Sequence, residues 1–131
     1  MRIARSLLPG LGTLILSASA LAHHSFSAQF DVGRPVNLTG TVMNVEWTNP
    51  HAWVFIETED KAGEPQRWAI ELLGINSLMR SGMTPDTVKP GVQLTIKGFG
   101  ARDGTNTANA SSVIHTETGR ALWASAREKA N

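Results

Sequence analysis

The sequence contains no cysteine, which excludes disulfide bonds, thiolate metal ligands and thiol nucleophiles. The fold must therefore be held by packing alone, and a metal site would use imidazole, carboxylate, backbone or methionine ligands. The chain also lacks an uninterrupted apolar run of about 20 residues, which a membrane-spanning helix requires. We therefore expect no retained membrane span.

The first 22 residues have the three parts of a secretory signal peptide. Arg2 and Arg5 give a basic start, residues 7–16 are mostly apolar, and Ala20-Leu21-Ala22 matches the small-x-small pattern of a signal-peptidase site. Cleavage after Ala22 would leave 109 of the 131 residues, which suits a single domain over residues 23–131. Ala18-Ser19-Ala20 offers an alternative site. The expected location is the periplasm.

Strong charge of either sign is absent from the expected mature chain. The leader contains two of the 12 lysines and arginines, so 10 basic and 11 acidic residues remain after it. Such a chain has no basic surface that would argue for nucleic acid. We therefore expect no nucleic-acid partner.

Five segments of alternating apolar and polar residues predict five β-strands. The segments cover residues 36–47, 52–58, 66–72, 92–97 and 110–116. The apolar parity changes after Val42, close to Gly40, which indicates a bulge or coil in the first strand. The tail from Glu117 is expected to be frayed beyond Trp123.

A short helix is predicted over residues 74–82, between the third and fourth strands. Asn76 or Ser77 can cap its start, and Gly82 can end it. This order of elements is that of the five-stranded oligonucleotide/oligosaccharide-binding (OB) barrel. We predict an all-β, small OB-like barrel, with a small open β-sandwich as the alternative.

Two adjacent histidines, His23 and His24, follow the expected cleavage site at Ala22. As residue one, His23 would offer both its α-amino group and its ring to one metal ion. Such a nitrogen-rich set, completed by another histidine, suits Cu(II). Cleavage after Ala20 would place His23 at position three, where the amine, two backbone nitrogens and the imidazole bind Cu(II) or Ni(II) in a plane. The alternative is that both are simply polar residues near an exposed end.

His51 is the preferred third ligand, with His24 as an alternative. It lies in a turn made rigid by Pro50 and flanked by Trp47 and Trp53. A rigid turn can hold a metal-binding ring in place, although Asn49 and His51 can equally serve only to satisfy backbone groups there. His115 is expected on the last strand as a half-buried histidine.

The tryptophans suggest a second class of function, a binding module. Trp53 and Trp68 fall in strongly apolar strands and are expected in the core. Trp47 and Trp123 are expected to be freer, so with Asn49 they are the candidate ligand-binding residues. In this alternative, the barrel face binds a peptide, a glycan or a cell-envelope protein without metal.

Catalysis finds little support in the sequence. No serine has a nucleophile-elbow context, and no glycine-rich loop could cradle a phosphate. Glu71 is the only acid among apolar neighbours, and the strand alternation points it outward. We therefore expect no enzymatic activity, with a redox enzyme built on the copper site as a further alternative.

Three motifs carry a family resemblance: AHHSF at residues 22–26, EWTNPH at 46–51 and DGTNTAN at 103–109. With them, the chain resembles a family of small exported proteins from Gram-negative bacteria, classified as a domain of unknown function. The resemblance covers nearly the whole expected mature chain and implies a periplasmic, β-barrel-like domain. It implies no activity. The His-His start and the Asn-Pro-His turn of the family correspond to His23, His24 and His51.

Overall fold

A computed structural model describes residues 26–125, which are mostly β-strand. A helical turn at residues 26–29, the N-terminal turn, leads into the first strand. The elements that follow are β1 (Phe30–Glu46), β2 (Trp53–Glu59), β3 (Pro65–Glu71), α2 (Ile75–Ser81), β4 (Gln93–Ala101), β5 (Thr107–His115) and β6 (Ala121–Ala124). The predicted all-β class is confirmed, and the short helix lies between the third and fourth strands as predicted.

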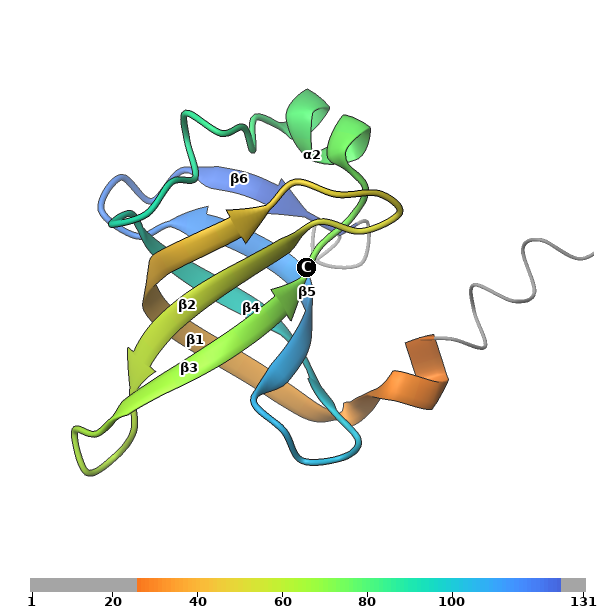
Figure 1. The fold of residues 1–131 in the computed structure, drawn as a ribbon, viewed down its shortest axis with the longest axis vertical. Helices are drawn as coiled ribbons and strands as arrows, with labels where there is room; N and C mark the ends of the chain where they lie inside the picture. Colours follow the sequence, from red (N-terminus) through yellow and green to blue (C-terminus); the bar gives the residue numbers. More distant parts are fainter. Residues whose placement is uncertain (1–25, 126–131) are drawn as a thin grey trace, which may run out of the picture.

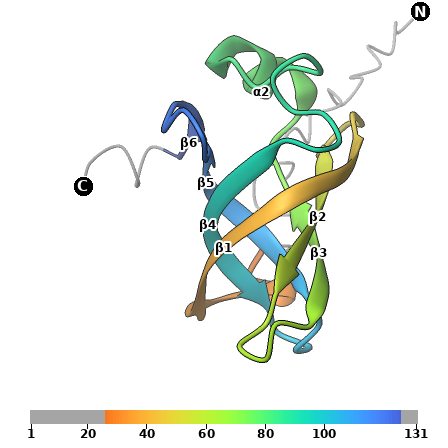
Figure 2. The same ribbon diagram turned by 90° about the vertical axis from the view of Figure 1, so that its left-hand side faces the viewer.

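One sheet contains all six strands in the order β3-β2-β1-β4-β5-β6, and neighbours in this order are antiparallel. β3 also pairs in parallel with β5, through Ala69 and Thr107 among other residues. This extra pairing joins β1, β2, β3, β5 and β4 into a closed ring, and β6 extends the sheet beyond β5. Figures 1 and 2 place α2 and β6 at one end, and the β2–β3 hairpin and β4–β5 loop at the other.

The strong coiling of β1 agrees with the predicted parity change. The register between β1 and β2 shifts between Val42 and Asn44, which is the expected bulge. At Gly40 a Cβ atom would lie 2.6 Å from the backbone oxygen of Glu57. Glycine is therefore needed there because it lets the two strands approach closely.

Two expectations about the ends of the domain are wrong. The prediction of five strands missed β6, which lies almost entirely before the part of the tail expected to fray and pairs with β5. β1 begins at Phe30 rather than at residue 36. Both additions depend on backbone pairing with a neighbouring strand, which the local alternation of side chains does not reveal.

The helix α2 closes one end of the ring over the core. Gly74 is its N-cap and makes no side-chain capping bond, so the expected capping by Asn76 or Ser77 is wrong. Gly82 ends the helix in the left-handed region with φ of 98°, as predicted. Leu78 of this helix is fully buried. No helix between residues 26 and 125 is long and apolar enough to cross a membrane.

The core is built from aliphatic side chains of every strand. Its buried members include Val54 and Ile56 of β2 and Ile96 of β4. Trp123 also belongs to the core and is only 9% exposed. The expectation that Trp123, like Trp47, is freer than Trp53 and Trp68 is therefore wrong for Trp123, whose ring packs inside and offers little surface to a ligand.

Candidate functional site

The loop between β1 and β2 is fastened to the residues around the start of α2. The Asn49 side-chain oxygen accepts a hydrogen bond from the backbone of Ile75 at 3.4 Å. Thr48 donates its hydroxyl to the His51 carbonyl at 2.9 Å, and Ala52 donates its N–H to Leu73 at 3.1 Å. Asn49 is thus exposed but occupied as an acceptor in the turn. These bonds hold the backbone on both sides of His51.

His51 forms a short ion pair with Glu71 at the end of β3. Its Nδ1 lies 2.6 Å from Oε1 of Glu71. The side chain of Glu71 is 8% exposed, whereas that of His51 is 47% exposed. The ring therefore has one nitrogen on a buried carboxylate, while about half of the side chain remains in contact with solvent.

Glu71 is buried although it points away from the interior of the ring. Cross-strand pairing places Trp53 of β2 on one side of it and Asn109 of β5 on the other. Burial raises the pKa of the Glu71 carboxyl above its usual value, and the opposing effect of His51 is smaller. The expectation from alternation holds for the direction of this side chain but misses its burial.

The pair fixes which ring nitrogen of His51 is available. When the ring is neutral, Nδ1 carries the proton that Glu71 accepts, so Nε2 carries the lone pair. Histidines that bind metals commonly donate their other N–H to a carboxylate in this way, which orients the ring and raises its basicity. His51 and Glu71 thus have the arrangement of a metal-binding histidine and its supporting carboxylate.

An open pocket of about 600 Å³ lies between the N-terminal turn, Trp53 and the β4–β5 loop. Ala28 and Gln29 of the N-terminal turn form one wall, and Trp53 with Thr105 and Arg102 forms others. Trp53 is only half-buried, so the expectation that it belongs to the core is wrong. Trp53 is the strand partner of Glu71, but neither Glu71 nor His51 lines this pocket.

The remaining predicted site residues are distributed differently. His23 and His24 lie outside the described residues. Trp47 is half-buried and packs against the core. His115 is half-buried too, and its Nδ1 is buried without a hydrogen-bond partner. Within residues 26–125, no group of three or more His, Asp or Glu side chains is positioned to hold a metal ion.

The sequence analysis recognised one residue of this region only in part and missed another entirely. Glu71 was noticed as an acid among apolar neighbours, but its partner His51 lies 20 positions away and meets it only through the pairing of β2 with β3. Arg102 gave no signal at all. Its side chain contacts Ser27 and Asp31, which are far from it in the sequence.

Comparison with known families supports the resemblance noted from the motifs. The model of a family of unknown function (DUF6152) matches residues 12–110. The chain belongs to this family. No curated protein matches the chain. Neither finding assigns an activity, so the function must be argued from the residues themselves.

Proposed function

We propose that this family member is an exported, OB-like barrel that binds one Cu(II) ion at the start of its mature chain, without enzymatic activity. The ligands are the α-amino group and ring of His23 and the Nε2 atom of His51, with His24 as the alternative ring ligand. The observation that carries the proposal is the 2.6 Å contact between His51 Nδ1 and the buried carboxylate of Glu71.

The chemistry of this pair favours a metal over a purely structural role. The buried carboxylate orients the ring, while the side chain of His51 stays 47% exposed and can therefore still reach a ligand. Imidazole and amine nitrogens are the donors that Cu(II) prefers, and Cu(II) has the highest affinity of the common divalent ions.

The strand pairing supports the OB-like assignment. A closed ring in the order β1-β2-β3-β5-β4 with a helix after β3 is the arrangement that the OB barrel uses. In that barrel type, ligands bind over β2 and β3 and the adjoining β1–β2 and β4–β5 loops. His51 lies in the first of these loops, and the pocket beside Trp53 includes the second.

The test is native mass spectrometry of the protein exported to a periplasm, with one equivalent of Cu(II) added and then a competing chelator. The apo mass fixes the cleavage site. We expect a chain that begins at His23 and retains one copper. A chain that begins elsewhere, or that releases copper to a weak chelator at once, would overturn the proposal.

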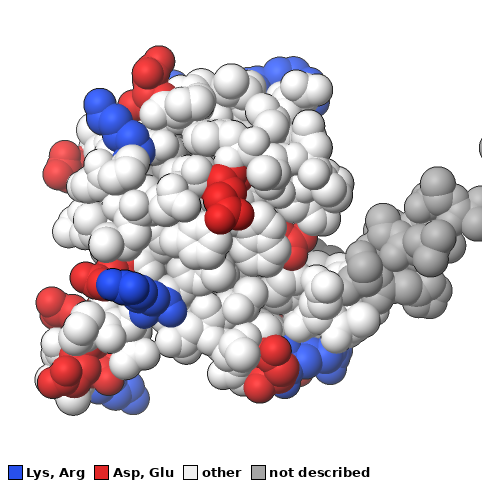
Figure 3. All heavy atoms as spheres, viewed as in Figure 1, with Lys and Arg blue, Asp and Glu red and all other residues white. Residues whose placement is uncertain are grey.

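A binding module without metal is the second candidate. Its support is a groove of about 370 Å³ beside β1–β3, lined by the apolar Met43, Phe55 and Trp68 and by one charged residue, Arg67. Figure 3 shows broad uncharged surface on this face, interrupted by an acidic side chain near its centre and a basic side chain toward the lower left. Tryptophan fluorescence that responds to a cell-envelope fraction but not to Cu(II) would favour this candidate.

A further inference from the structure

The open pocket beside Trp53 has walls from three segments that lie far apart in the sequence. Trp53 comes from β2, Gln29 comes from the N-terminal turn, and the β4–β5 loop contributes Arg102 and Asp103. The pocket volume of about 600 Å³ lies within the range of about 300–1,000 Å³ that is usual for small-molecule sites. Because His51 does not line this pocket, it is separate from the proposed copper site.

The polar side chains of the β4–β5 loop are held in place by contacts with one another. The Oδ1 atom of Asp103 accepts hydrogen bonds from the backbone N–H of Thr105 at 3.0 Å and from its hydroxyl at 2.7 Å. The hydroxyls of Thr105 and Thr107 lie 3.2 Å apart, and both residues line the pocket. Because the Asp103 carboxylate is already ordered, a ligand that bonds to it pays little additional side-chain entropy.

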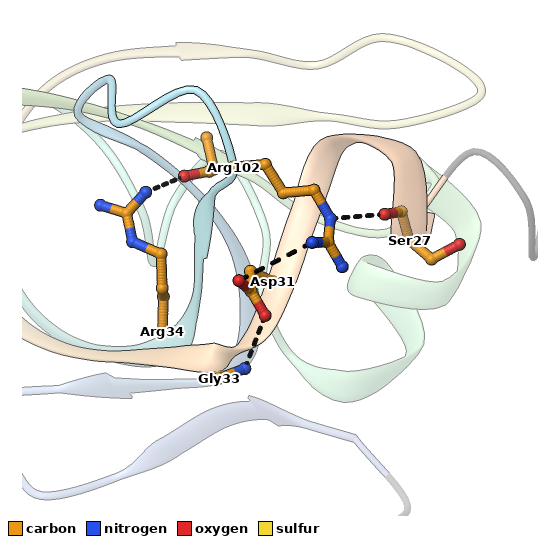
Figure 4. A network of polar contacts seen from close by, with 6 residues as sticks. Ser27, Asp31, Gly33, Arg34 and Arg102 are labelled. Carbon is orange, nitrogen blue, oxygen red and sulfur yellow. Dashed lines mark hydrogen bonds and ion pairs between the residues drawn. The ribbon is translucent and has the colours of Figure 1, made fainter.

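Arg102 holds a second wall, the N-terminal turn, against the same loop. Its Nε donates to the Ser27 carbonyl at 2.7 Å, and its backbone N–H donates to the Gln29 carbonyl at 2.9 Å. Its guanidinium also lies 3.8 Å from the Asp31 carboxylate, and Figure 4 shows the side chain reaching across to Ser27 and Asp31. The Arg102 side chain is still 50% exposed, so its remaining N–H groups can donate to a ligand.

The lining of the pocket favours a neutral ligand that carries many hydroxyl groups. Arg102 and Asp103 are the charged residues among those that line it, one of each sign, so an ion of either sign gains little net attraction. Trp53 is half-buried and supplies a flat apolar surface. The C–H face of a pyranose ring stacks on such a surface, while the hydroxyls around its rim both donate and accept hydrogen bonds. The pocket offers both kinds of partner, since Arg102 donates and Asp103 accepts.

We propose that this pocket binds a neutral saccharide, with one sugar ring stacked on Trp53 and its hydroxyls bonded to Arg102 and Asp103. The site does not depend on the proposed copper site, and it differs from the groove lined by Met43. A nucleic acid fits less well, because Asp103 opposes the attraction of Arg102 for phosphate groups.

The test is an NMR titration of protein exported to a periplasm, with a metal chelator present. The probe is cellobiose, a neutral disaccharide whose equatorial hydroxyls leave flat apolar ring faces. We expect the indole N–H signal of Trp53 to shift more than those of the other tryptophans, because the sugar ring lies on this indole. The signal is assigned by its loss in Trp53→Ala.

Trp68→Ala is the matched control for Trp53→Ala. Both indoles are half-buried on neighbouring strands, but Trp68 lines the groove beside β1–β3 instead of this pocket. We expect Trp53→Ala to weaken cellobiose binding at least about fivefold and Trp68→Ala less than about twofold. Thermal unfolding checks that both variants are folded. If Trp53→Ala does not fold, a second pair of variants tests the proposal.

That second pair is Asp103→Ala and its matched control Asp60→Ala. Both carboxylates are exposed, so neither change disturbs the core. The Oδ1 atom of Asp60 likewise accepts hydrogen bonds in a loop, from the backbone of Ala62 at 2.8 Å and Glu64 at 3.0 Å, but between β2 and β3. We expect at least about a threefold loss of cellobiose affinity for Asp103→Ala and no measurable change for Asp60→Ala.

The outcomes are independent of the copper test, because the titration is made without metal. If cellobiose, maltose and diacetylchitobiose all leave the Trp53 signal unmoved up to about 50 mM, the saccharide site is wrong even where copper is retained. Equal losses from Trp53→Ala and Trp68→Ala, or from Asp103→Ala and Asp60→Ala, would also overturn it. Tighter binding of glucuronate or glucosamine than of glucose would overturn the preference for a neutral ligand.

Discussion

His51 and His115, the two histidines in the described part of the chain, have opposite surroundings. The Nδ1 atom of His51 lies on a buried carboxylate at 2.6 Å, and the side chain is 47% exposed. The Nδ1 atom of His115 is buried with no hydrogen-bond partner, on a strand position opposite the fully buried Leu94. The Nδ1 atom of one ring has a carboxylate partner, whereas the Nδ1 atom of the other ring has none.

The difference shows what prepares a histidine for metal binding. Both residues have the same ring, but only His51 has a carboxylate on Nδ1 that sets its tautomer and orientation. His115 instead lies at the end of β5, where its backbone N–H donates to Arg120 and its carbonyl accepts from Gly119. These two backbone bonds close the turn before β6. His115 therefore serves as the internal control for the proposed role of His51.

The largest expected effect is on copper affinity. His51→Ala removes the proposed third ligand and should weaken Cu(II) binding at least tenfold, which corresponds to about 1.4 kcal/mol. His115→Ala should change it less than twofold. Competition titration with a chelator of known affinity measures both. Equal effects at the two positions, or an unchanged affinity for His51→Ala, would remove His51 from the site.

The next effect is on the stability of the metal-free protein. His51→Leu leaves the Glu71 carboxyl buried without its partner, which should lower the free energy of unfolding by about 1–3 kcal/mol. His115→Leu removes an unpaired nitrogen instead and should change it by less than about 1 kcal/mol, in either direction. Urea denaturation in the presence of a chelator compares them.

The double variant His51→Leu/Glu71→Leu is the control for this comparison. Replacing both partners removes the unpaired carboxyl, so it should be more stable than His51→Leu alone. If the double variant is the less stable of the two, Glu71 contributes through other contacts and the ion pair is not the cause.

The fold could be predicted from the sequence only in part. Alternation identified the first five strands because each buries one face of its own residues, and Gly82 marked the end of the helix. β6 was missed because its four residues, Ala121–Ala124, are too few to show a period. They form a strand only because Ser112 and its neighbours in β5 offer a partner. Pairing between distant segments leaves no local pattern.

The site was less accessible for a related reason. Alternation placed Glu71 on the outer side of β3 correctly, but a strand's period says nothing about what covers that side. The parallel pairing of β3 with β5 and the loop that carries His51 together bury the carboxyl. Likewise, Trp53 was expected in the core but is half-buried, and Trp123 was expected to be freer but lies in the core. Hydrophobicity alone does not distinguish an inward-facing position from an outward-facing one.

The smallest expected effect is on the pH dependence of the free energy of unfolding, which should differ between Glu71 and the exposed acid Asp103. Burial raises the pKa of Glu71, so the folded protein binds this proton more tightly than the unfolded chain does. Glu71 therefore adds stability at acid pH, and this contribution is lost as the pH rises through its raised pKa. Relative to Glu71→Gln, metal-free wild type should become less stable from acid to neutral pH.

Asp103 should show the opposite trend, because hydrogen bonds from Thr105 lower the pKa of its fully exposed carboxyl. Its contribution is present above the ordinary aspartate pKa and is lost as the pH falls through the lowered value. Relative to Asp103→Asn, wild type should thus gain stability as the pH rises through the acid range. Denaturation curves at several pH values test both signs. Parallel trends for the two acids would mean that burial does not govern the titration of Glu71, and the carboxylate beside His51 would then behave as an ordinary surface group.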